Sequence, residues 1–342
     1  MKRASIGVTP SGVVILGPDI SCDGFHRDYG IRVQTHVHVD HMHNFETSKG
    51  YQDIYLSNPT LQLLISDYDA DLDARDNLIP LKIGEDRIVN SSRLRTLSSD
   101  HMIGSLQVAV ELADGIRVGY SGDFQWPLDE VMKVEQLVLD STYGAPDSIR
   151  LYSQEEAEEK LLAVAVDKIR SGPLHIKAHR GTLHRGMQVL SELEAWPCIA
   201  SPRLCREAQV YRDFGYPIRP IFPTKSSEAC AAIKDGRFIQ FYGMGDKFPL
   251  QVENGTAIIL SAFMSDTRNP LLELSERAVR VALTDHADFT GVLEYVSATG
   301  AEYVVTDNSR GSHAVQLANE IRERLGIIAI ASELGGTKEW GM

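Results

Sequence analysis

The hydrophobic and polar positions of this chain follow two different patterns along its length. Up to about residue 142, short runs of β-branched and large apolar residues are separated by turn residues, as in 31–34, 94–97, 106–112 and 116–120. Such short runs, several of them alternating with a period of two, predict strands. The first part of the chain is therefore expected to form sheets, with a helix near 60–66.

After Pro146 the pattern changes to strand and helix signals in turn. Ser153 and Glu156 have the spacing of a capping box, and the helix that follows is expected to turn Leu161 and Ile169 inward. Strands that alternate with helices are typical of a parallel sheet. The later segments of this kind are 174–178, 183–193, 198–200, 204–214, 226–233 and 256–260.

Composition fits a large water-soluble enzyme. A chain of 342 residues with 43% hydrophobic content can bury a full core and is long enough for two domains. Its apolar stretches are far shorter than a bilayer requires, and no signal-length apolar segment follows Met1, so we expect a cytoplasmic protein with no membrane partner. The net charge of −13 argues against broad attraction to nucleic acid, but bound cations would offset part of it.

A cluster of metal-ligand side chains directly follows the predicted strand 31–34. His36, His38, Asp40 and His41 lie within six residues. Imidazole and carboxylate are ligands for zinc and related divalent ions. These side chains cannot all face one way on a strand or a helix, so we expect them to line a turn that holds a catalytic metal. The alternative is a chance cluster or a helix cap.

Two further candidate ligands follow later strands. His101 comes shortly after the strand 94–97, and Asp123 follows the strand 116–120 beside Gly122. A carboxylate at this place can bridge two ions. Two metals roughly 3.5–4 Å apart hold both the attacking and the leaving oxygen of an in-line displacement. The sequence therefore predicts hydrolytic chemistry.

This series of motifs resembles the metallo-β-lactamase superfamily: H-x-H-x-D-H, then a single His, then Gly-Asp-Phe after a strand. Two later segments are similar to the β-CASP nuclease branch. Residues 137–144 form a strand ending in Asp-Ser-Thr-Tyr-Gly, and residues 282–289 contain a His followed by a small residue, Asp and an aromatic. The resemblance implies an α/β chain, a metallo-β-lactamase αββα sandwich of residues 1–142 and 272–342, with an inserted parallel-sheet α/β (β-CASP) domain over 143–271.

The resemblance also implies a division of ligands between two divalent ions, with zinc expected and manganese as the alternative. His36, His38 and His101 would hold one ion. Asp40 and His41 would hold the other, and Asp40 would also contact the attacking hydroxide. Asp123 would be shared between the two ions.

A second pair of residues is implied by the same resemblance. His286 would pair with Asp140, whose carboxylate stabilises the charged ring so that it can protonate the departing oxygen. Without that role, His286 would be a satisfied histidine at a strand end and Asp140 a cap.

Two more carboxylates are candidates near the metals. Asp307 lies 21 residues after His286, where relatives that cut RNA carry a His and relatives that act on DNA carry an apolar residue. It is expected to be a ligand that favours harder ions, although it could instead form a turn. Asp23 is expected to orient the metal loop from behind, with Asp19 as the alternative.

A basic segment is the candidate phosphate-binding surface. Lys177, Arg180 and Arg185 surround a helix predicted to start near Thr182, whose backbone N–H groups would point at phosphate. The alternative is an exposed basic turn. Ser265, in a small-residue loop similar to that of relatives, and Arg310 are further substrate-binding candidates.

The sequence thus predicts a two-metal phosphodiesterase that cuts single-stranded nucleic acid. We expect it to act as an exonuclease. RNA is the first choice and DNA, as in repair, is the close alternative. A small-molecule hydrolase would use the same metal cluster but would have no use for the pair of Asp140 and His286. A non-catalytic scaffold would normally have lost metal ligands. A homodimer is left open.

Overall fold

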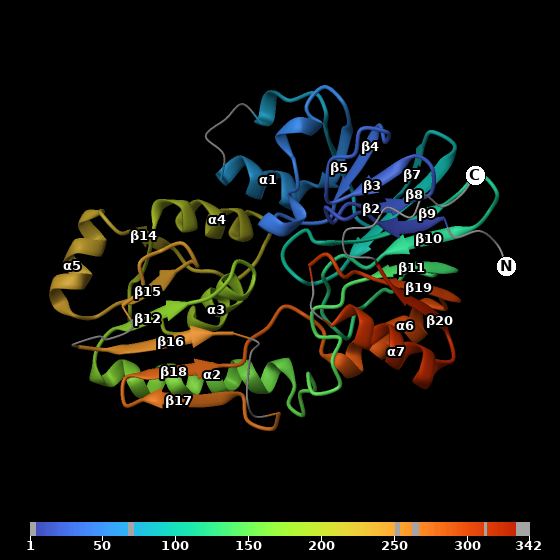
Figure 1. Cartoon of the computed structure of the whole chain (residues 1–342). Coiled ribbons are helices and arrows are strands. Elements are labelled where there is room, and N and C mark those ends of the chain that lie inside the picture. The colour runs from blue at the N-terminus through green and yellow to red at the C-terminus, as the bar shows by residue number, and fades with distance from the viewer. Residues whose placement is uncertain (1–4, 68–71, 250–253, 262–266, 311–312, 333–342) are drawn as a thin grey trace. The chain divides into compact units, whose positions relative to one another are not determined.

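The computed structural model describes residues 5–67, 72–249, 254–261, 267–310 and 313–332. The chain is a mixed α/β protein, as predicted, and divides into two compact units (Figure 1). The first unit comprises residues 1–149 and 286–342, and the second comprises residues 150–285. In the described ranges, no helix combines the length and the apolar character needed to cross a membrane.

The first unit contains a six-stranded sheet made from the N-terminal part of the chain. Its first three strands pair antiparallel, and the later neighbours pair parallel. In spatial order the strands are β1 (Ile6–Val8), β2 (Val14–Leu16), β3 (Ile20–Cys22), β4 (Ile31–Gln34), β5 (Asp53–Ser57) and β6 (Leu78–Leu81).

The same unit contains a seven-stranded sheet that joins distant parts of the chain. Its first four strands in spatial order pair parallel, and the remaining neighbours pair antiparallel. The order is β20 (Ile328–Ala331), β19 (Tyr303–Thr306), β11 (Gln136–Leu139), β10 (Arg117–Tyr120), β9 (Leu106–Glu111), β8 (Ser92–Ser98) and β7 (Asp86–Val89).

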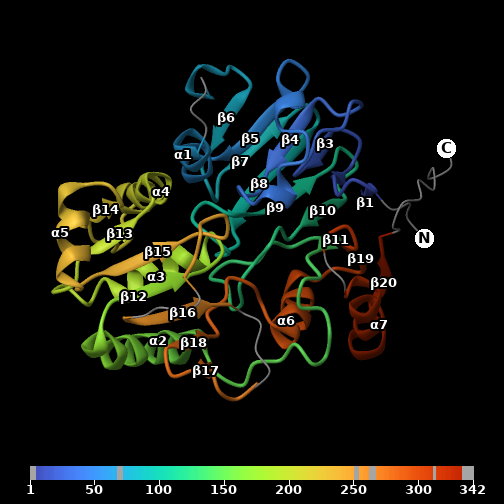
Figure 2. The same cartoon turned by 60° about the vertical axis from the view of Figure 1, so that its left-hand side comes forward.

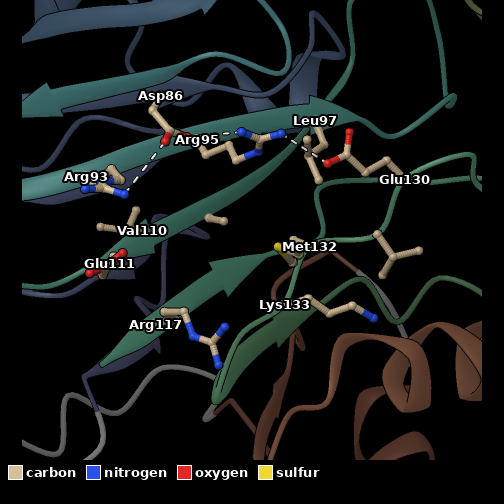
Figure 3. Close-up of a pocket in the computed structure, with 12 residues that line it drawn as sticks. Asp86, Arg93, Arg95, Leu97, Val110, Glu111, Arg117, Glu130, Met132 and Lys133 are labelled. Carbon is tan, nitrogen blue, oxygen red and sulfur yellow. Dashed lines mark hydrogen bonds and ion pairs between the residues drawn. The ribbon is translucent and has the colours of Figure 1, made fainter. Parts of the chain in front are cut away.

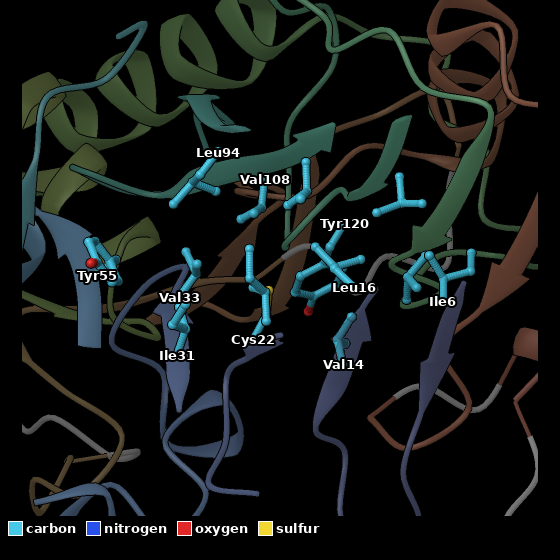
Figure 4. Packing of buried hydrophobic residues seen from close by; sticks show 14 of the residues in the cluster. Ile6, Val14, Leu16, Cys22, Ile31, Val33, Tyr55, Leu94, Val108 and Tyr120 are labelled. Carbon is cyan, nitrogen blue, oxygen red and sulfur yellow. The ribbon is translucent and has the colours of Figure 1, made fainter. Parts of the chain in front are cut away.

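The two sheets of the first unit enclose a hydrophobic core. Figure 4 shows Val14, Leu16 and Val33 of the six-stranded sheet facing Leu94 and Val108 of the seven-stranded sheet. All five side chains are almost completely buried. The alternation predicted from the sequence thus places the apolar face of each sheet against the other.

The other face of the seven-stranded sheet is covered by helices. Val138 of β11 belongs to the core between the sheets, whereas Leu137 and Leu139 pack with Phe289 and Leu317 of two helices. A strand buried on both faces needs apolar residues at every position, as β11 has. The helices are α6 (Phe289–Thr299) and α7 (Ala314–Leu325), which Figure 2 shows beside β19 and β20; α1 (Asn58–Asp67) contacts β5 and β6.

The second unit is built on a sheet that is parallel except for one edge strand, as the alternating signals predict. In spatial order its strands are β14 (Ile221–Pro223), β13 (Cys198–Ala200), β15 (Ile239–Tyr242), β12 (Leu174–Lys177), β16 (Thr256–Leu260), β18 (Ala278–Val281) and the antiparallel β17 (Leu271–Ser275). Its helices are α2 (Gln154–Lys168), α3 (Thr182–Leu190), α4 (Pro202–Asp213) and α5 (Ser227–Asp235). Short 3₁₀ turns in the chain are η1 (Val39–His41), η2 (Glu46–Ser48), η3 (Leu72–Ala74) and η4 (Ile169–Ser171).

The limits of the second unit differ from the predicted insert, 143–271. The unit begins at Arg150 and continues to Asp285. The later end has a simple cause, because β18 pairs parallel with β16 and so extends the sheet of the second unit. The predicted capping box is present, with the Ser153 side chain and the Glu156 side chain each accepting the other residue's backbone N–H.

Candidate metal centre

The predicted metal cluster occupies the loop that follows β4. The chain leaves β4 at Gln34, is extended at His38 and reaches a single 3₁₀ turn, η1, at Val39. His36 and His41 are completely buried, while the Asp40 side chain is 60% exposed. The extended segment and the tight turn place His36, His38 and His41 in the groups of possible metal donors, which do not include Asp40.

Asp23 lies behind this loop and holds it. Its carboxylate accepts hydrogen bonds from the backbone N–H of Thr35 at 2.8 Å, the Thr35 hydroxyl at 2.7 Å and the Nδ1 of His41 at 2.7 Å. Burial alone would raise the pKa of Asp23, but the His41 ring and these hydrogen bonds lower it below its ordinary value. Because Nδ1 of His41 is hydrogen-bonded to Asp23, its Nε2 is the atom directed at the cluster.

Asp123 lies at the centre of the cluster. Its Oδ2 is 3.6 Å from Nε2 of His36 and 3.7 Å from Nε2 of His101, and its Oδ1 is 3.3 Å from Nε2 of His41. The Nε2 of His101 is also 3.0 Å from Nδ1 of His38. The two carboxylate oxygens of Asp123 therefore face different histidines, which is the arrangement expected of a bridging carboxylate.

The described residues form groups that could hold metal ions. His36, His38, His101 and Asp123 each offer a donor atom within 4.8 Å of the others, and Asp23, His36 and His41 form a second such group. The donor set of imidazole nitrogens and carboxylate oxygens is the one that zinc and related divalent ions prefer.

Two buried histidine nitrogens without hydrogen-bond partners indicate whether a cation fits this cluster. Among the described residues, Nε2 of His36 and Nε2 of His41 are buried and make no hydrogen bond. A buried polar atom without a partner costs about 1–3 kcal/mol, and most such atoms in proteins are satisfied. Burial, and then the charge of His41, lower the pKa of His36 well below its ordinary value, which keeps the ring neutral and able to ligate. The residues present fit a divalent metal.

His41 is electrostatically different from His36. Burial disfavours its charged ring, but the carboxylates of Asp123 and Asp23 outweigh this and raise its pKa to about 10. Asp123 shows the reverse effect, since burial would raise its pKa but His41 and His36 hold it well below the ordinary value. The cluster thus favours a positive charge beside Asp123, which a bound cation would supply.

The structure also brings together the second predicted pair. Nδ1 of His286 lies 3.1 Å from Oδ2 of Asp140, and its Nε2 lies 3.8 Å from Oδ2 of Asp123. The other oxygen of Asp140 accepts hydrogen bonds from the backbone and hydroxyl of Thr142 at 2.8 and 2.7 Å. Asp140 is thus held in place, and it orients His286 toward the metal cluster.

Asp307 is not among the described groups of metal donors. Its Oδ1 accepts hydrogen bonds from the backbone and hydroxyl of Ser309 at 2.8 and 2.5 Å, and its Oδ2 lies 2.6 Å from Nη1 of Arg310. The carboxylate that was expected to bind a metal is therefore occupied by a buried ion pair.

Arg310 is likewise engaged within the protein. Besides Asp307, its guanidinium donates to the carbonyl of Asp40 at 3.1 Å and to the carbonyl of Gly12 at 2.5 Å. Its side chain is only 9% exposed. The residue predicted to contact substrate therefore ties the η1 turn to two other loops, and its whole charge faces a carboxylate and two carbonyls.

The predicted phosphate-binding cations lie in the second unit and differ in their surroundings. Arg180 donates to both oxygens of the fully buried Glu207, at 2.8 and 3.1 Å, and Arg185 pairs with Glu158. Lys177 has no carboxylate partner among the described residues, and its Nζ lies 5.5 Å from the ring centroid of Phe248. Ser265 falls outside the described residues.

Two residues of the loop support were not predicted. Arg32 is completely buried and donates to Gln34 and to the carbonyls of His43 and His41. Gln34 donates to the carbonyls of His36, at 2.6 Å, and of His41, at 3.1 Å. Polar residues at alternate positions of a strand usually indicate a face exposed to solvent. In β4 they instead lie under the loop that carries the histidine cluster. The available signal was their place directly before the histidine cluster.

A further pocket lies away from these donors, in the first unit. Figure 3 shows this cavity of about 280 Å³ on β8, β9 and β10, lined by charged side chains. Arg95 pairs there with Asp86 at 3.3 Å and with Glu130 at 3.2 Å. None of the groups of possible metal donors among the described residues lies at this pocket.

Comparison with known proteins gives limited similarity. No family model matches the chain. An "Uncharacterized protein in lig 3'region" of Acidianus ambivalens is 29% identical over 104 residues, which cover 30% of this chain and 74% of that protein. The transcription termination factor FttA of Pyrococcus horikoshii is 26% identical over a region that covers 40% of this chain. That region is 26% of FttA, so the chain matches about a quarter of its length.

One solved structure shares the fold over most of the chain. It is a protein of unknown function from Enterococcus faecalis V583, with a TM-score of 0.63 and 15% sequence identity, covering 91% of this chain and 82% of that protein. The likeness concerns the fold alone. The chain thus combines a distant similarity to a transcription termination factor with a His and Asp cluster that could bind metal ions.

Proposed function

We propose that this protein is a two-metal phosphodiesterase of the β-CASP branch of the metallo-β-lactamase superfamily, and that it hydrolyses single-stranded nucleic acid. One observation carries the proposal: four histidines and Asp123 converge at the end of β4, with the His286 and Asp140 pair directed at the same carboxylate. The helix-covered pair of sheets supports the metallo-β-lactamase assignment, and the parallel sheet of the second unit supports the β-CASP assignment.

The residues divide between two ions as follows. His36, His38 and His101 would hold one ion, Asp40 and His41 would hold the other, and Asp123 would contribute one oxygen to each. Two bound divalent ions would neutralise charge on a phosphate and lower the pKa of a bound water. Zinc is the expected metal and manganese the alternative.

His286 and Asp140 would handle the proton. Asp140 holds the Nδ1 side of the ring, so the Nε2 atom is the one that faces the metal cluster and would carry the proton for the departing oxygen. The thiolate that leaves a thioester would need no such acid. The pair therefore favours a substrate whose leaving group is an alkoxide, as in a phosphodiester.

Asp307 would affect the metal site indirectly, through its contact with Arg310. Its ion pair with Arg310 holds the carbonyl of Asp40 and so fixes the η1 turn. We propose that Asp307 positions Asp40 through Arg310, in place of the metal-ligand role expected from the sequence.

RNA is the favoured substrate, and exonucleolytic cleavage the favoured mode. The similarity to a transcription termination factor supports RNA, since transcripts are the molecules on which termination acts. DNA remains the second candidate, because the side chain in the third-motif position supplies no histidine and is occupied by Arg310.

Cleavage of labelled nucleic acid tests the proposal. The purified protein, loaded with zinc or with manganese, would be incubated with end-labelled single-stranded RNA and DNA of one sequence. We expect the wild-type protein to cut RNA preferentially, and Asp123→Asn to lose at least about a hundredfold in rate, because its carboxylate serves both ions. The exposed Asp114→Asn is the matched control and should cleave like wild type.

The opposite results are equally clear. An Asp123→Asn variant that folds and cleaves at the wild-type rate would contradict the metal centre. Preferential cutting of DNA would assign the second substrate. If wild type cuts neither nucleic acid but hydrolyses a thioester or a lactone, the nuclease proposal is wrong.

A further inference from the structure

The second unit contains a cavity at the carboxyl ends of its central strands. It has a volume of about 290 Å³ and is lined by residues that follow or end β12, β15 and β16. From β12 the chain continues through α3 to β13 on one side of the sheet, while β16 pairs with β12 on the other side. Such a change of direction makes a crevice where α/β sheets bind ligands. The volume lies just below the range of about 300–1,000 Å³ that is usual for small-molecule pockets.

Lys177 supplies an uncompensated positive charge to this cavity. It ends β12 and has no carboxylate partner in the described part of the chain. The other cations of the basic segment differ, since Arg180 is held by Glu207 and Arg185 by Glu158. An anion could therefore pair with Lys177 without breaking an existing ion pair.

Phe248 supplies a fixed aromatic surface beside that charge. Its ring packs edge to face against Tyr242, with centroids 5.3 Å apart and an interplanar angle of 78°. The Tyr242 hydroxyl in turn lies 2.8 Å from Nδ1 of His175, a buried residue of β12. The ring of Phe248 is thus held in place by residues of the sheet. The Nζ atom of Lys177 lies 5.5 Å from the centroid of that ring.

The rest of the cavity wall is largely apolar. Met244 is 51% exposed at its edge, and Leu260 ends β16 beside it. Met244 and Leu260 thus extend the apolar surface around the Phe248 ring. The wall therefore fits a flat, apolar ligand with a negatively charged group.

We propose that this cavity binds one nucleotide of a single strand, with the base stacked on Phe248 and the phosphate paired with Lys177. The choice of a nucleotide, among flat aromatic anions, rests on the proposed nuclease function. Stacking on an aromatic side chain accepts every base, which suits a strand of any sequence.

Binding of a mononucleotide to the full-length protein tests the proposal. The protein would be titrated calorimetrically with adenosine monophosphate, adenosine or inorganic phosphate, in the presence of a chelator so that no metal-dependent step contributes. The variants are Phe248→Ala, Phe248→Trp and Lys177→Met. Matched controls in the same unit are Phe214→Ala, an exposed aromatic residue, and Lys234→Met, an exposed lysine.

We expect Phe248→Ala to weaken binding of adenosine monophosphate by about tenfold or more, which is the usual loss when one stacked base loses its aromatic partner. Phe248→Trp should retain binding, because a larger ring preserves the stacking surface. Lys177→Met should weaken binding of adenosine monophosphate but leave adenosine unchanged. Both controls should bind like wild type.

Three results would overturn the proposal. The first is wild-type protein that binds none of the three probes. The second is that the Phe248→Ala and Lys177→Met proteins bind like the controls. The third is that wild type binds inorganic phosphate and adenosine monophosphate equally well. Since no hydrolysis is measured, nucleotide binding with a failed cleavage assay would refute the nuclease function alone. Cleavage without nucleotide binding would refute only this cavity.

Discussion

At the scale of single residues, the candidate metal ligands and the supporting Asp23 could be predicted, but the contacts of Arg32, Gln34 and Arg310 with the same loop could not. His36, His38, Asp40 and His41 are adjacent in the sequence, so their chemistry is visible without a fold. Arg310 contacts the carbonyl of Asp40 from 270 positions away. No local pattern specifies such a contact, because only the folded sheets bring the two loops together. The contact of Asp307 with Arg310 was missed for the same reason, and the sequence predicted a metal ligand at that position.

The buried pair of Arg310 and Asp307 gives a stability prediction. Arg310→Met leaves the Asp307 carboxylate buried without its counter-charge, and breaking such a pair costs about 3–5 kcal/mol. The matched control is Arg95→Met, which removes partly exposed pairs with Asp86 and Glu130 and should cost about 1 kcal/mol or less. Urea unfolding of the three proteins measures both values. Equal losses for the two variants would show that the Arg310 contacts do not hold the loop.

At the scale of elements, strands with a clear apolar run and helices with a cap were predictable, but not every short strand was. The capping box of α2 and the alternating strand β9 appear where the pattern places them. β14 has three residues and ends in a proline, so it has no measurable period. In β4 all four residues are buried, because the metal loop covers the face that its polar residues occupy.

β12 carries a histidine whose titration should affect folding. Burial lowers the pKa of His175 to about 4, whereas an unfolded histidine titrates near about 6.5. Between these two pH values, His175 is protonated in the unfolded chain but neutral in the folded protein. The stabilising contribution of neutral His175 is therefore complete above about pH 6.5 and is lost progressively as the pH falls toward 4.

The prediction concerns a difference between variants. From about pH 7 to about pH 5, wild type should lose about 1–2 kcal/mol more unfolding free energy than His175→Gln does. The exposed His179→Gln serves as control and should follow wild type. Urea unfolding at the two pH values gives the comparison. Parallel losses in wild type and His175→Gln would show that His175 does not resist protonation in the folded state.

At the scale of the whole molecule, the sequence predicted an α/β chain and a change of organisation near Pro146, but it placed the end of the second part too early. The pairing of β18 with β16 could not be predicted, because it is a property of the assembled sheet. The net charge of −13 is also better understood at this scale, since part of it comes from carboxylates such as Asp23 and Asp123, which lie in the two adjoining groups of possible metal donors.

The central claim is that this cluster is a centre for two divalent ions, and elemental analysis of the purified protein tests it most directly. After loading with zinc or manganese and removal of unbound metal, the account predicts two ions per chain for wild type. Asp123→Asn should retain fewer, because it loses the shared carboxylate. A content near zero in folded wild-type protein, or the same content in Asp123→Asn and wild type, would contradict the account.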